Sequence, residues 1–396
     1  MNTIKLVEKD SCVGCGACQN ICPVECIEMN YDSEGFLYPK IDDEKCISCG
    51  KCAKSCPVMS SKRKNDILSF WGGYIKDKKI NSISSSGGAF WWLAEKTLCD
   101  NGMVYGATID SSNGHVYHMR VDSIEELELI TKSKYVQSEI GKTYKSIQSD
   151  LQDGHSVLFC GTPCQVAGLR SYLVNDDLQK KLVAVEFICH GCPSPMVWEE
   201  YIQHLREKGV NPIQSIDFRD KRNGWHNFGL SIKYGKNSEH NRFKGVREDV
   251  YYNGFIENLF LRPSCYSCRF KGLSSYADIS IADFWNCENR GGTAKLNERQ
   301  FDGISLIIAF SKKGRDYVKS CGEEFYLEEM NDEKCITTNV AQIKPAEKNK
   351  NRKKFFALRQ RKGTVLALNK YAKYTFRKKI TNIVKWKLWK LLGWYQ

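Results

Sequence analysis

CVGCGACQNICP at residues 12–23 and CISCGKCAKSCP at residues 46–57 are the two stretches that decide the fold of the first 60 residues. The four cysteines of the first stretch recur in the second with a constant offset of 34 residues, and each stretch ends in Cys-Pro. A constant offset at every cysteine is typical of a duplicated unit. We therefore expect residues 1–60 to form a domain of their own, built from two copies of one module.

This cysteine spacing is typical of four-iron clusters. A Cys-x-x-Cys-x-x-Cys loop supplies three thiolates, and in two-cluster bacterial ferredoxins the fourth is the Cys-Pro cysteine of the other copy. Zinc modules usually pair two Cys-x-x-Cys units across a longer gap, which matches less well. The predicted ligands are Cys12, Cys15, Cys18 and Cys56 for one 4Fe-4S cluster and Cys46, Cys49, Cys52 and Cys22 for the other. Cys26 lies outside the pattern and is expected to be a buried thiol beside a cluster.

The composition is that of a folded globular chain. Hydrophobic residues make up 42% and charged residues 27% of the 396 residues, which argues against wholesale disorder and against a polytopic membrane protein. The nineteen cysteines fall mostly in close groups, as ligands do, rather than in a disulfide framework. The opening MNTIKLVEKD has no apolar run typical of a signal peptide, so we expect a reducing cytoplasm.

A polar linker, SSKRKND at 60–66, separates the cysteine module from a longer body over residues 61–345. Strand-like runs alternate there with helical patterns, which predicts an α+β fold: a ferredoxin-like domain followed by a mixed α/β body. The runs that favour strands are 156–160, 182–189, 279–283 and 304–310. The patterns that favour helices are 88–100, 123–131, 141–151 and 196–208.

The positive charge of the chain is concentrated at its C-terminal end. The formal net charge is +13, but residues 348–396 carry sixteen Lys or Arg and no acidic residue, which leaves 43 basic against 46 acidic residues elsewhere. We therefore expect residues 346–396 to form a basic tail, with helically spaced apolar positions from Ile380 to Leu392. Such a tail suits an anionic membrane surface, at the inner face of the membrane. Docking to an acidic protein partner or to the protein's own body is the alternative. No nucleic-acid role is expected, because no recognised motif is present.

Six phrases of the body, taken with the cysteine module, carry a family resemblance. They are SSSGGAFWWLA at 84–94, KSKYVQSEIG at 132–141, FCGTPCQVAGLR at 159–170, FICHGCPSPMVW at 187–198, PSCYSCRFKG at 263–272 and ADISIADFW at 277–285. In this order they resemble the coenzyme F-420 hydrogenase/dehydrogenase beta-subunit family of iron–sulfur flavoproteins, over about residues 5–345. The resemblance implies a flavin, FAD or alternatively FMN, that exchanges electrons with neighbouring clusters.

Several polar residues in these phrases are candidates for flavin binding. A small-residue turn that opens a helix exposes backbone N–H groups to a phosphate, and a tight Ser-capped turn explains the same residues. A strand that ends in Gly-Thr-Pro delivers polar groups to a crevice, and a solvated loop is the alternative for the Lys-Tyr phrase. The predicted flavin-binding residues are Ser86, Gly87, Gly88, Lys134, Tyr135, Gln137, Ser138, Gly161, Thr162, Pro163 and Asp283. His190 is the candidate proton donor beside the flavin, against a structural role.

Six further cysteines leave the ligands of a third cluster ambiguous. The family pattern favours Cys164, Cys189, Cys265 and Cys268, and it leaves Cys160 and Cys192 as second-choice ligands or packing thiols. A lone Cys-x-x-Cys is weak evidence, since it also occurs in zinc sites and redox pairs. The other family phrases are what raise the expectation of a third 4Fe-4S cluster.

The expected function is that of a flavin-dependent iron–sulfur oxidoreductase. Electrons would pass from a reduced ferredoxin or similar donor through the clusters to the flavin, and on to an organic acceptor such as coenzyme F-420 or a polysaccharide-related substrate. The alternative is an electron-transfer subunit that serves a separate catalytic partner. A redox-sensing module has no support beyond the clusters themselves.

Overall fold

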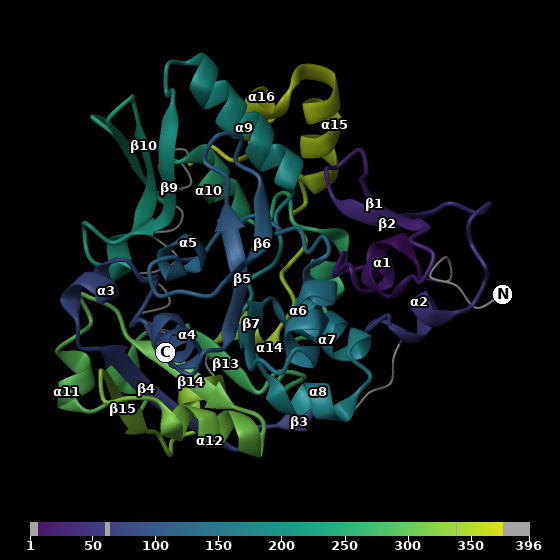
Figure 1. Ribbon diagram of the computed structural model, residues 1–396. Helices are drawn as coiled ribbons and strands as arrows, with labels where there is room; N and C mark the ends of the chain where they lie inside the picture. The colour runs from purple at the N-terminus through teal and green to yellow at the C-terminus, as the bar shows by residue number, and fades with distance from the viewer. Residues whose placement is uncertain (1–6, 60–63, 338, 375–396) are drawn as a thin grey trace.

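The structure, a computed structural model, describes residues 7–59, 64–337 and 339–374. The first of these ranges is the cysteine module, shown in purple in Figure 1. Its elements are η2 (Lys9–Ser11), α1 (Ala17–Ile21), β1 (Ile27–Tyr31), β2 (Leu37–Ile41) and α2 (Lys51–Lys54), with β1 and β2 forming an antiparallel hairpin. The duplication is visible in the backbone, because α1 and α2 each follow a glycine, Gly16 and Gly50, with the same φ of 71° and ψ of 0°. That left-handed conformation suits glycine, which has no Cβ atom to clash there.

The body is built on one mixed sheet of eight strands, in the order β15-β4-β14-β13-β8-β7-β5-β6. Its strands are β4 (Ser69–Ile75), β5 (Met103–Ile109), β6 (Val116–Val121), β7 (Val157–Gly161), β8 (Leu182–Phe187), β13 (Ile279–Asp283), β14 (Ser305–Ala309) and β15 (Phe325–Glu329). The inner strands β5, β7, β8 and β13 run parallel, and the other neighbouring pairs run antiparallel. Parallel inner strands place their carboxyl ends along one edge, where ligands bind in open α/β sheets.

Alternate residues of the strands build a hydrophobic core on each side of the sheet. On β7, Val157 and Phe159 pack on one side with α6 (Thr143–Gln152) and α7 (Pro163–Tyr172), while Leu158 packs on the other with α4 (Ala89–Cys99). Both faces are therefore covered, as the near-continuous apolar runs of these strands require. The other helices around the sheet are α3 (Lys78–Ser82), α5 (Leu127–Ile130), α8 (Asp176–Lys181), α11 (Ala294–Asn297), α12 (Lys312–Ser320), α13 (Lys334–Thr337) and α14 (Val340–Ile343).

A second layer, at the top of Figure 1, packs around a separate hydrophobic core, to which Phe36 of the cysteine module and Val116 of β6 also contribute. It consists of the three-stranded sheet β9 (Ile213–Asp220), β10 (Gly229–Tyr234) and β11 (His240–Gly245) with the helices α9 (Pro195–Glu207), α10 (Val250–Ile256), α15 (Arg352–Lys362) and α16 (Thr364–Tyr371). The short elements β3 (Asn65–Asp66), β12 (Ser274–Ser275), η3 (Trp225–Asn227), η4 (Pro263–Ser267) and η5 (Cys287–Asn289) complete the chain.

The first part of the basic C-terminal segment is integrated into this second layer. Phe355, Phe356 and Leu368 of α15 and α16 are buried in its core. The amphipathic stretch from Ile380 to Leu392 lies outside the described residues. Among the helices that the structure describes, none combines the length and the apolarity that a bilayer span would need.

The fold class expected from the sequence is confirmed: a ferredoxin-like module precedes a mixed α/β body. The four strand-like runs correspond to β7, β8, β13 and β14, and three of the helical patterns to α4, α6 and α9. The pattern at 123–131 predicts a longer helix than the chain forms, since only Leu127–Ile130 is helical. The helix propensity of this stretch is weak at its start, because Asp122 and Ser123 favour a turn.

Candidate functional site

The cysteines of the N-terminal module converge on two small hollows. One is lined by Cys12, Cys15, Cys18 and Cys56, and the other by Cys22, Cys46, Cys49 and Cys52. Each hollow thus takes three thiols from one repeat and the Cys-Pro thiol from the other. These are the two sets that the spacing predicts.

Sulfur is the donor type that both hollows present. The other side chains around them are mostly apolar, with no carboxylate or imidazole among the residues that line them. Soft thiolate donors in apolar surroundings fit an iron–sulfur cluster, which uses a separate thiolate for each iron. Cys26 is buried in the second hollow with its Sγ 3.4 Å from Sγ of Cys22, so it lies where a thiol beside a cluster is expected.

A third hollow in the body collects five cysteines from three separate segments. They are Cys164 in the first turn of α7, Cys189 and Cys192 after β8, and Cys265 and Cys268 around η4. The thiol of Cys192 hydrogen-bonds to the sulfur atoms of Cys189 and Cys265. These hydrogen bonds lower the pKa of Cys189 to about 7, and they also lower the pKa of Cys265. Burial raises the pKa of Cys164.

The sixth body cysteine, Cys160, lies elsewhere. It lines the large pocket described below and not the third hollow. Cys192 lines both cavities. The structure therefore brings the four favoured cysteines together, adds Cys192 beside them and separates Cys160 from them.

A pocket of about 340 Å³ opens at the carboxyl ends of the parallel strands. It contains most of the predicted flavin-binding residues, since Ser86, Gly88, Lys134, Tyr135, Gln137, Ser138, Gly161, Thr162 and Asp283 line it, together with His190. Pro163 lines the third cysteine hollow instead. Gly87 packs against the sheet, where a Cβ atom would come within 2.6 Å of the Gly73 carbonyl oxygen. The volume lies within the range of small-molecule and cofactor sites.

The serine turn before α4 is held largely by its own protein partners. The hydroxyl of Ser84 donates to Ile80 O at 2.8 Å, and that of Ser86 donates to Ile304 O at 2.6 Å. Gly88 caps α4 with a φ of +89°, a left-handed conformation that glycine adopts without strain. The serine hydroxyls are thus structural, and what the turn offers to a ligand is the backbone at the start of α4.

Lys134 brings a half-buried ammonium group into the pocket wall. Its ammonium group donates to the carbonyl oxygens of Thr131 at 2.7 Å and Leu129 at 3.3 Å, and burial lowers its pKa to about 7. A half-buried cation whose hydrogen-bond acceptors are carbonyl groups is stabilised by an anion that approaches it. This wall therefore fits a ligand with an anionic or electron-rich group.

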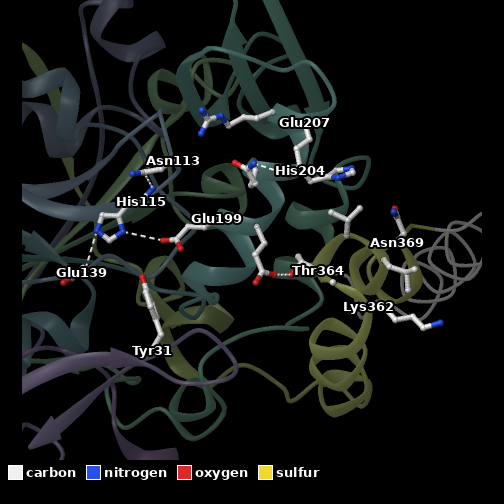
Figure 2. A pocket seen from close by; sticks show the side chains of 16 residues that line it. Tyr31, Asn113, His115, Glu139, Glu199, His204, Glu207, Lys362, Thr364 and Asn369 are labelled. Carbon is white, nitrogen blue, oxygen red and sulfur yellow. Dashed lines mark hydrogen bonds and ion pairs between the residues drawn. The ribbon is translucent and has the colours of Figure 1, made fainter.

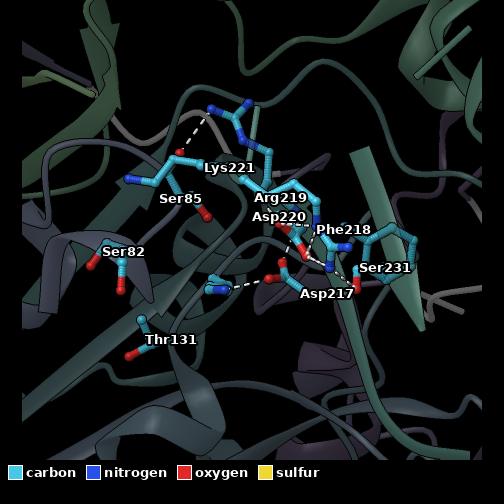
Figure 3. A network of polar contacts seen from close by, with 12 residues as sticks. Ser82, Ser85, Thr131, Asp217, Phe218, Arg219, Asp220, Lys221 and Ser231 are labelled. Carbon is cyan, nitrogen blue, oxygen red and sulfur yellow. Dashed lines mark hydrogen bonds and ion pairs between the residues drawn. The ribbon is translucent and has the colours of Figure 1, made fainter. Parts of the chain in front are cut away.

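A polar network behind the pocket ties its walls together, as Figure 3 shows around Arg219 and Lys221. Arg219, from the end of β9, is 3% exposed and donates to Ser85 O at 2.9 Å and to Asp283 Oδ1 at 2.8 Å. Lys221 donates to Ser86 O at 3.1 Å and to Asp302 O at 2.5 Å, and burial lowers its pKa to about 7. The second layer thus holds residues of the pocket in place.

His190 stands between the third hollow and the large pocket, since it lines both. Its Nε2 lies 2.6 Å from Asn258 Oδ1, which accepts a hydrogen bond only if Nε2 carries the proton. Burial lowers the pKa of His190, so its imidazole is neutral near pH 7.

Comparison with known families matches this arrangement. The model for the C terminus of the coenzyme F420 hydrogenase/dehydrogenase beta subunit matches residues 154–334, which include β7, the cysteine segments of the third hollow and β13. Residues 154–334 are a domain of this family. Two 4Fe-4S dicluster models match residues 11–60 and 38–89. The chain is therefore an iron–sulfur electron-transfer protein with a domain of an oxidoreductase family.

No curated protein matches the chain. Among solved structures, a chain of the xenon-derivatised F420-reducing [NiFe] hydrogenase complex from Methanosarcina barkeri is similar at 13% identity and a TM-score of 0.44. The match covers 80% of this chain and 96% of that chain.

The sequence phrases do not reveal several residues that line the large pocket or hold its walls from behind. Arg219 and Lys221 lie in no phrase that points to a ligand, and His118 on β6 is a lone histidine that lines the pocket. The RDKR run at 219–222 is the nearest signal, but charged runs are usually solvated. Trp225 does border this region, donating from Nε1 to Asp283 Oδ1 at 3.0 Å.

Another cavity, of about 1090 Å³, is a wide groove away from the cysteine hollows. Figure 2 shows His115 between Glu139 and Glu199, at 3.3 Å and 3.5 Å, with α16 on the far side of the groove. The hydrogen bond with Glu139 is the largest of the effects that raise the pKa of His115 to about 9. This histidine is therefore an internal counter-ion to two carboxylates.

Proposed function

We propose that the chain is a flavin-dependent iron–sulfur oxidoreductase, in which electrons from a ferredoxin-like donor pass through three 4Fe-4S clusters to a flavin and on to an organic acceptor. One observation carries the proposal. The third cysteine hollow and the large pocket share a wall, made of residues 189–192. A cluster in the hollow and a ring in the pocket would be neighbours, as electron exchange between them requires.

The order of the cavities supports a continuous electron path. Val13 lines both the hollow of Cys12 and the third hollow, so these two sites are also adjacent. The Cys22 and Cys12 hollows are joined by their interlocked repeats. The path would run from the Cys46 loop to the Cys12 loop, then to Cys164 and its partners, and end in the large pocket.

The residues of the large pocket fit a flavin. Lys134 would face its phosphate or the electron-rich edge of its ring, and Gln137, Ser138 and Thr162 offer hydrogen bonds. Asp283, held by Arg219, would bind a ribityl hydroxyl group. A bound flavin would supply the conversion between one-electron and two-electron chemistry. His190, whose ring lies in both cavity walls, is the proposed proton donor, for which it would first take up a second proton on Nδ1.

The exposed end of the path is the proposed entry point for electrons. Ile47 is 62% exposed and lies in the Cys46–Cys49 loop, of which Cys49 is itself exposed. Lys45 beside it is also exposed, with 70% of its side chain accessible. Lys45 is paired with Asp42 at 3.1 Å, whereas Lys51 and Lys54 of α2 are exposed as well. An apolar contact with neighbouring lysines suits an acidic, ferredoxin-like donor.

The runner-up function is an electron-transfer subunit that serves a separate catalytic polypeptide. The matched family is that of a beta subunit, which favours this alternative. For either function, the acceptor would be coenzyme F-420 or a polysaccharide-related substrate. Residues 375–396 would dock on a membrane surface, at the inner face of the membrane, or on an acidic protein partner. Cytoplasmic residence belongs to the same proposal.

Cofactor content tests the proposal directly. Anoxically purified protein should contain about twelve irons and one flavin per chain. About eight irons and no flavin would contradict both the third cluster and the flavin. Full cofactor content without turnover until a co-purified partner is added would favour the runner-up.

A further inference from the structure

Arg262 is a buried cation at the junction of the cysteine module and the body. It directly precedes η4, the segment that carries Cys265, and it is 1% exposed. Its Nε donates to Cys12 O at 2.8 Å, its Nη1 to Gln137 Oε1 at 3.1 Å and its Nη2 to Leu37 O at 3.0 Å. Nη2 also lies 3.7 Å from Cys12 Sγ. The side chain thus connects the first cysteine hollow with the third, which it lines.

The neighbouring chain is shaped around this guanidinium group. Gly14, between Cys12 and Cys15, has no room for a side chain, because a Cβ atom there would lie 2.7 Å from Nη1 of Arg262. The ring of Tyr38 stacks on the other side, with its centroid 4.2 Å from Cζ. The arginine is therefore held in one place and not free to turn toward solvent.

No carboxylate balances this charge within the ranges that the structure describes. The partners of Arg262 are carbonyl oxygens, an amide, a thiol and aromatic rings. The other two buried arginines near the module differ, since Arg352 is paired with Glu34 and Arg359 with Glu200. A buried charge without a counter-charge is costly, so an anion beside it would stabilise the fold.

Cluster thiolates are the anions within reach. Cys12 Sγ is in direct contact, and Arg262 lines the third hollow together with Cys265. Four thiolates give a 4Fe-4S cluster a net negative charge, which grows on reduction. A fixed cation between two such clusters stabilises their reduced states.

We propose that Arg262 tunes electron transfer. Its guanidinium group balances the negative charge of the clusters at Cys12 and Cys265 and raises the midpoint potentials of both. The part that concerns Cys265 rests on the proposed function, because it requires a third cluster. The part that concerns Cys12 requires only the N-terminal dicluster domain. Hydrogen bonds to sulfur and nearby charge are among the known determinants of such potentials.

The test is potentiometry, followed by electron paramagnetic resonance (EPR), on anoxic full-length protein. Arg262→Gln should make reduction of the Cys12 cluster at least about tenfold less favourable, which is about 59 mV for one electron. Arg262→Lys, which keeps the charge, should stay closer to the wild type. The matched control is Arg352→Gln, since Arg352 also joins the module to the body but pairs with Glu34 instead of a thiol.

A purely structural role predicts a different result. Arg262→Gln and Arg352→Gln would then destabilise the protein alike and leave the potentials at their wild-type values, which would overturn the proposal. If the Arg262→Gln variant loses iron, the contact is tested instead in wild-type protein labelled with guanidino-¹⁵N arginine. Pulsed EPR of the reduced Cys12 cluster should detect ¹⁵N coupling, and its absence would overturn the contact.

Failure of the proposed function gives a separate signature. Wild-type protein with about eight irons and no flavin would remove the third cluster, together with the Cys265 part of this proposal. The shift at the Cys12 cluster would still be measurable in that protein. The two proposals therefore fail on different measurements.

Discussion

Arg219 Nη2 lies 2.8 Å from Asp283 Oδ1, and this ion pair joins the end of β9 in the second layer to the end of β13 in the main sheet. The same guanidinium group holds the Ser85 carbonyl oxygen and lies 3.3 Å from the Tyr135 hydroxyl. Ser85, Tyr135 and Asp283 all line the large pocket. One buried arginine thus determines the relative position of three pocket segments.

Replacing Arg219 by Gln should damage both stability and ligand binding. Removing one partner of a largely buried pair costs about 3 kcal/mol, and the loosened walls should lower flavin affinity about tenfold or more. Thermal unfolding and flavin titration of the apoprotein measure these effects. Arg222→Gln is the control, since its pair with Asp220 is partly exposed and should contribute less than about 1 kcal/mol. Equal losses in the two variants would contradict the role of Arg219.

Serine substitution distinguishes the body cysteines. Cys164→Ser or Cys268→Ser should remove about four irons per chain and the EPR signal of one cluster. Cys160→Ser should keep the full iron content, because Cys160 lines the large pocket and not the third hollow. Iron analysis after anoxic purification measures both. Loss of iron from the Cys160 variant would reassign the ligands.

The interlocked arrangement predicts which cluster each Cys-Pro cysteine supports. Cys56→Ser should damage the cluster of the Cys12 loop and spare that of the Cys46 loop, although Cys56 lies next to the latter in sequence. EPR spectra of the Cys56→Ser and Cys22→Ser variants show which cluster signal each substitution removes. Cys26→Ser serves as the control that keeps both clusters. Loss of the Cys46-loop signal in the Cys56 variant would mean that each repeat holds its own cluster.

Flavin affinity should fall as the pH rises above about 7 if Lys134 faces an anionic group. Burial lowers the pKa of Lys134 to about 7 in the free protein, so above that pH binding must take up a proton. The loss is at most about tenfold per pH unit. Fluorescence titration between pH 6 and 8.5 tests this, and Lys134→Met should flatten the curve. An unchanged slope in that variant would assign the pH dependence to another group, such as Lys221, whose pKa burial also lowers to about 7.

The stability of the apoprotein should depend on pH in the opposite direction to the flavin affinity. Between the lowered pKa of Lys134 and the ordinary lysine pKa, the unfolded chain binds one proton more than the folded apoprotein does. The stability of the apoprotein should therefore rise with pH across that window, and Lys134→Met should remove this gain.

The exposed Ile47 should control reaction with the electron donor. Ile47→Glu places a negative charge where an acidic donor would dock, which should slow cluster reduction by ferredoxin about tenfold. Stopped-flow reduction with ferredoxin, and with dithionite as the small-molecule reference, measures it. Val174→Glu, at an exposed position outside the cysteine hollows, is the control. Equal rates with ferredoxin in all three proteins would move the entry point elsewhere.

Local patterns predict a large part of this molecule. The 34-residue offset predicts the sets that line the first two hollows, and apolar runs predict β7, β8, β13 and β14. These features depend on residues close together in sequence, where spacing reflects geometry directly. Most of the predicted flavin-binding residues also meet in one pocket, because strands of a parallel sheet end at a common edge.

Other features are not predictable from the same patterns. Cys160 and Cys164 lie four residues apart, yet they line different cavities, since one ends a strand and the other begins a helix. The serine turn is typical of a phosphate site, whereas its hydroxyl groups satisfy backbone carbonyl groups. Both outcomes depend on neighbours that are distant in sequence.

By itself, the sequence determined the duplicated module, the class of the fold and the thiols available to each N-terminal hollow. Only the tertiary structure decided that Arg219 holds the walls of the large pocket and that Arg262 lies between two cysteine sites, without a carboxylate partner among the residues described. Arg262 and Cys12 are 250 residues apart in the chain. Spacing along the chain specifies which ligands can meet within one loop, but the charge around a buried group depends on every segment that packs against it.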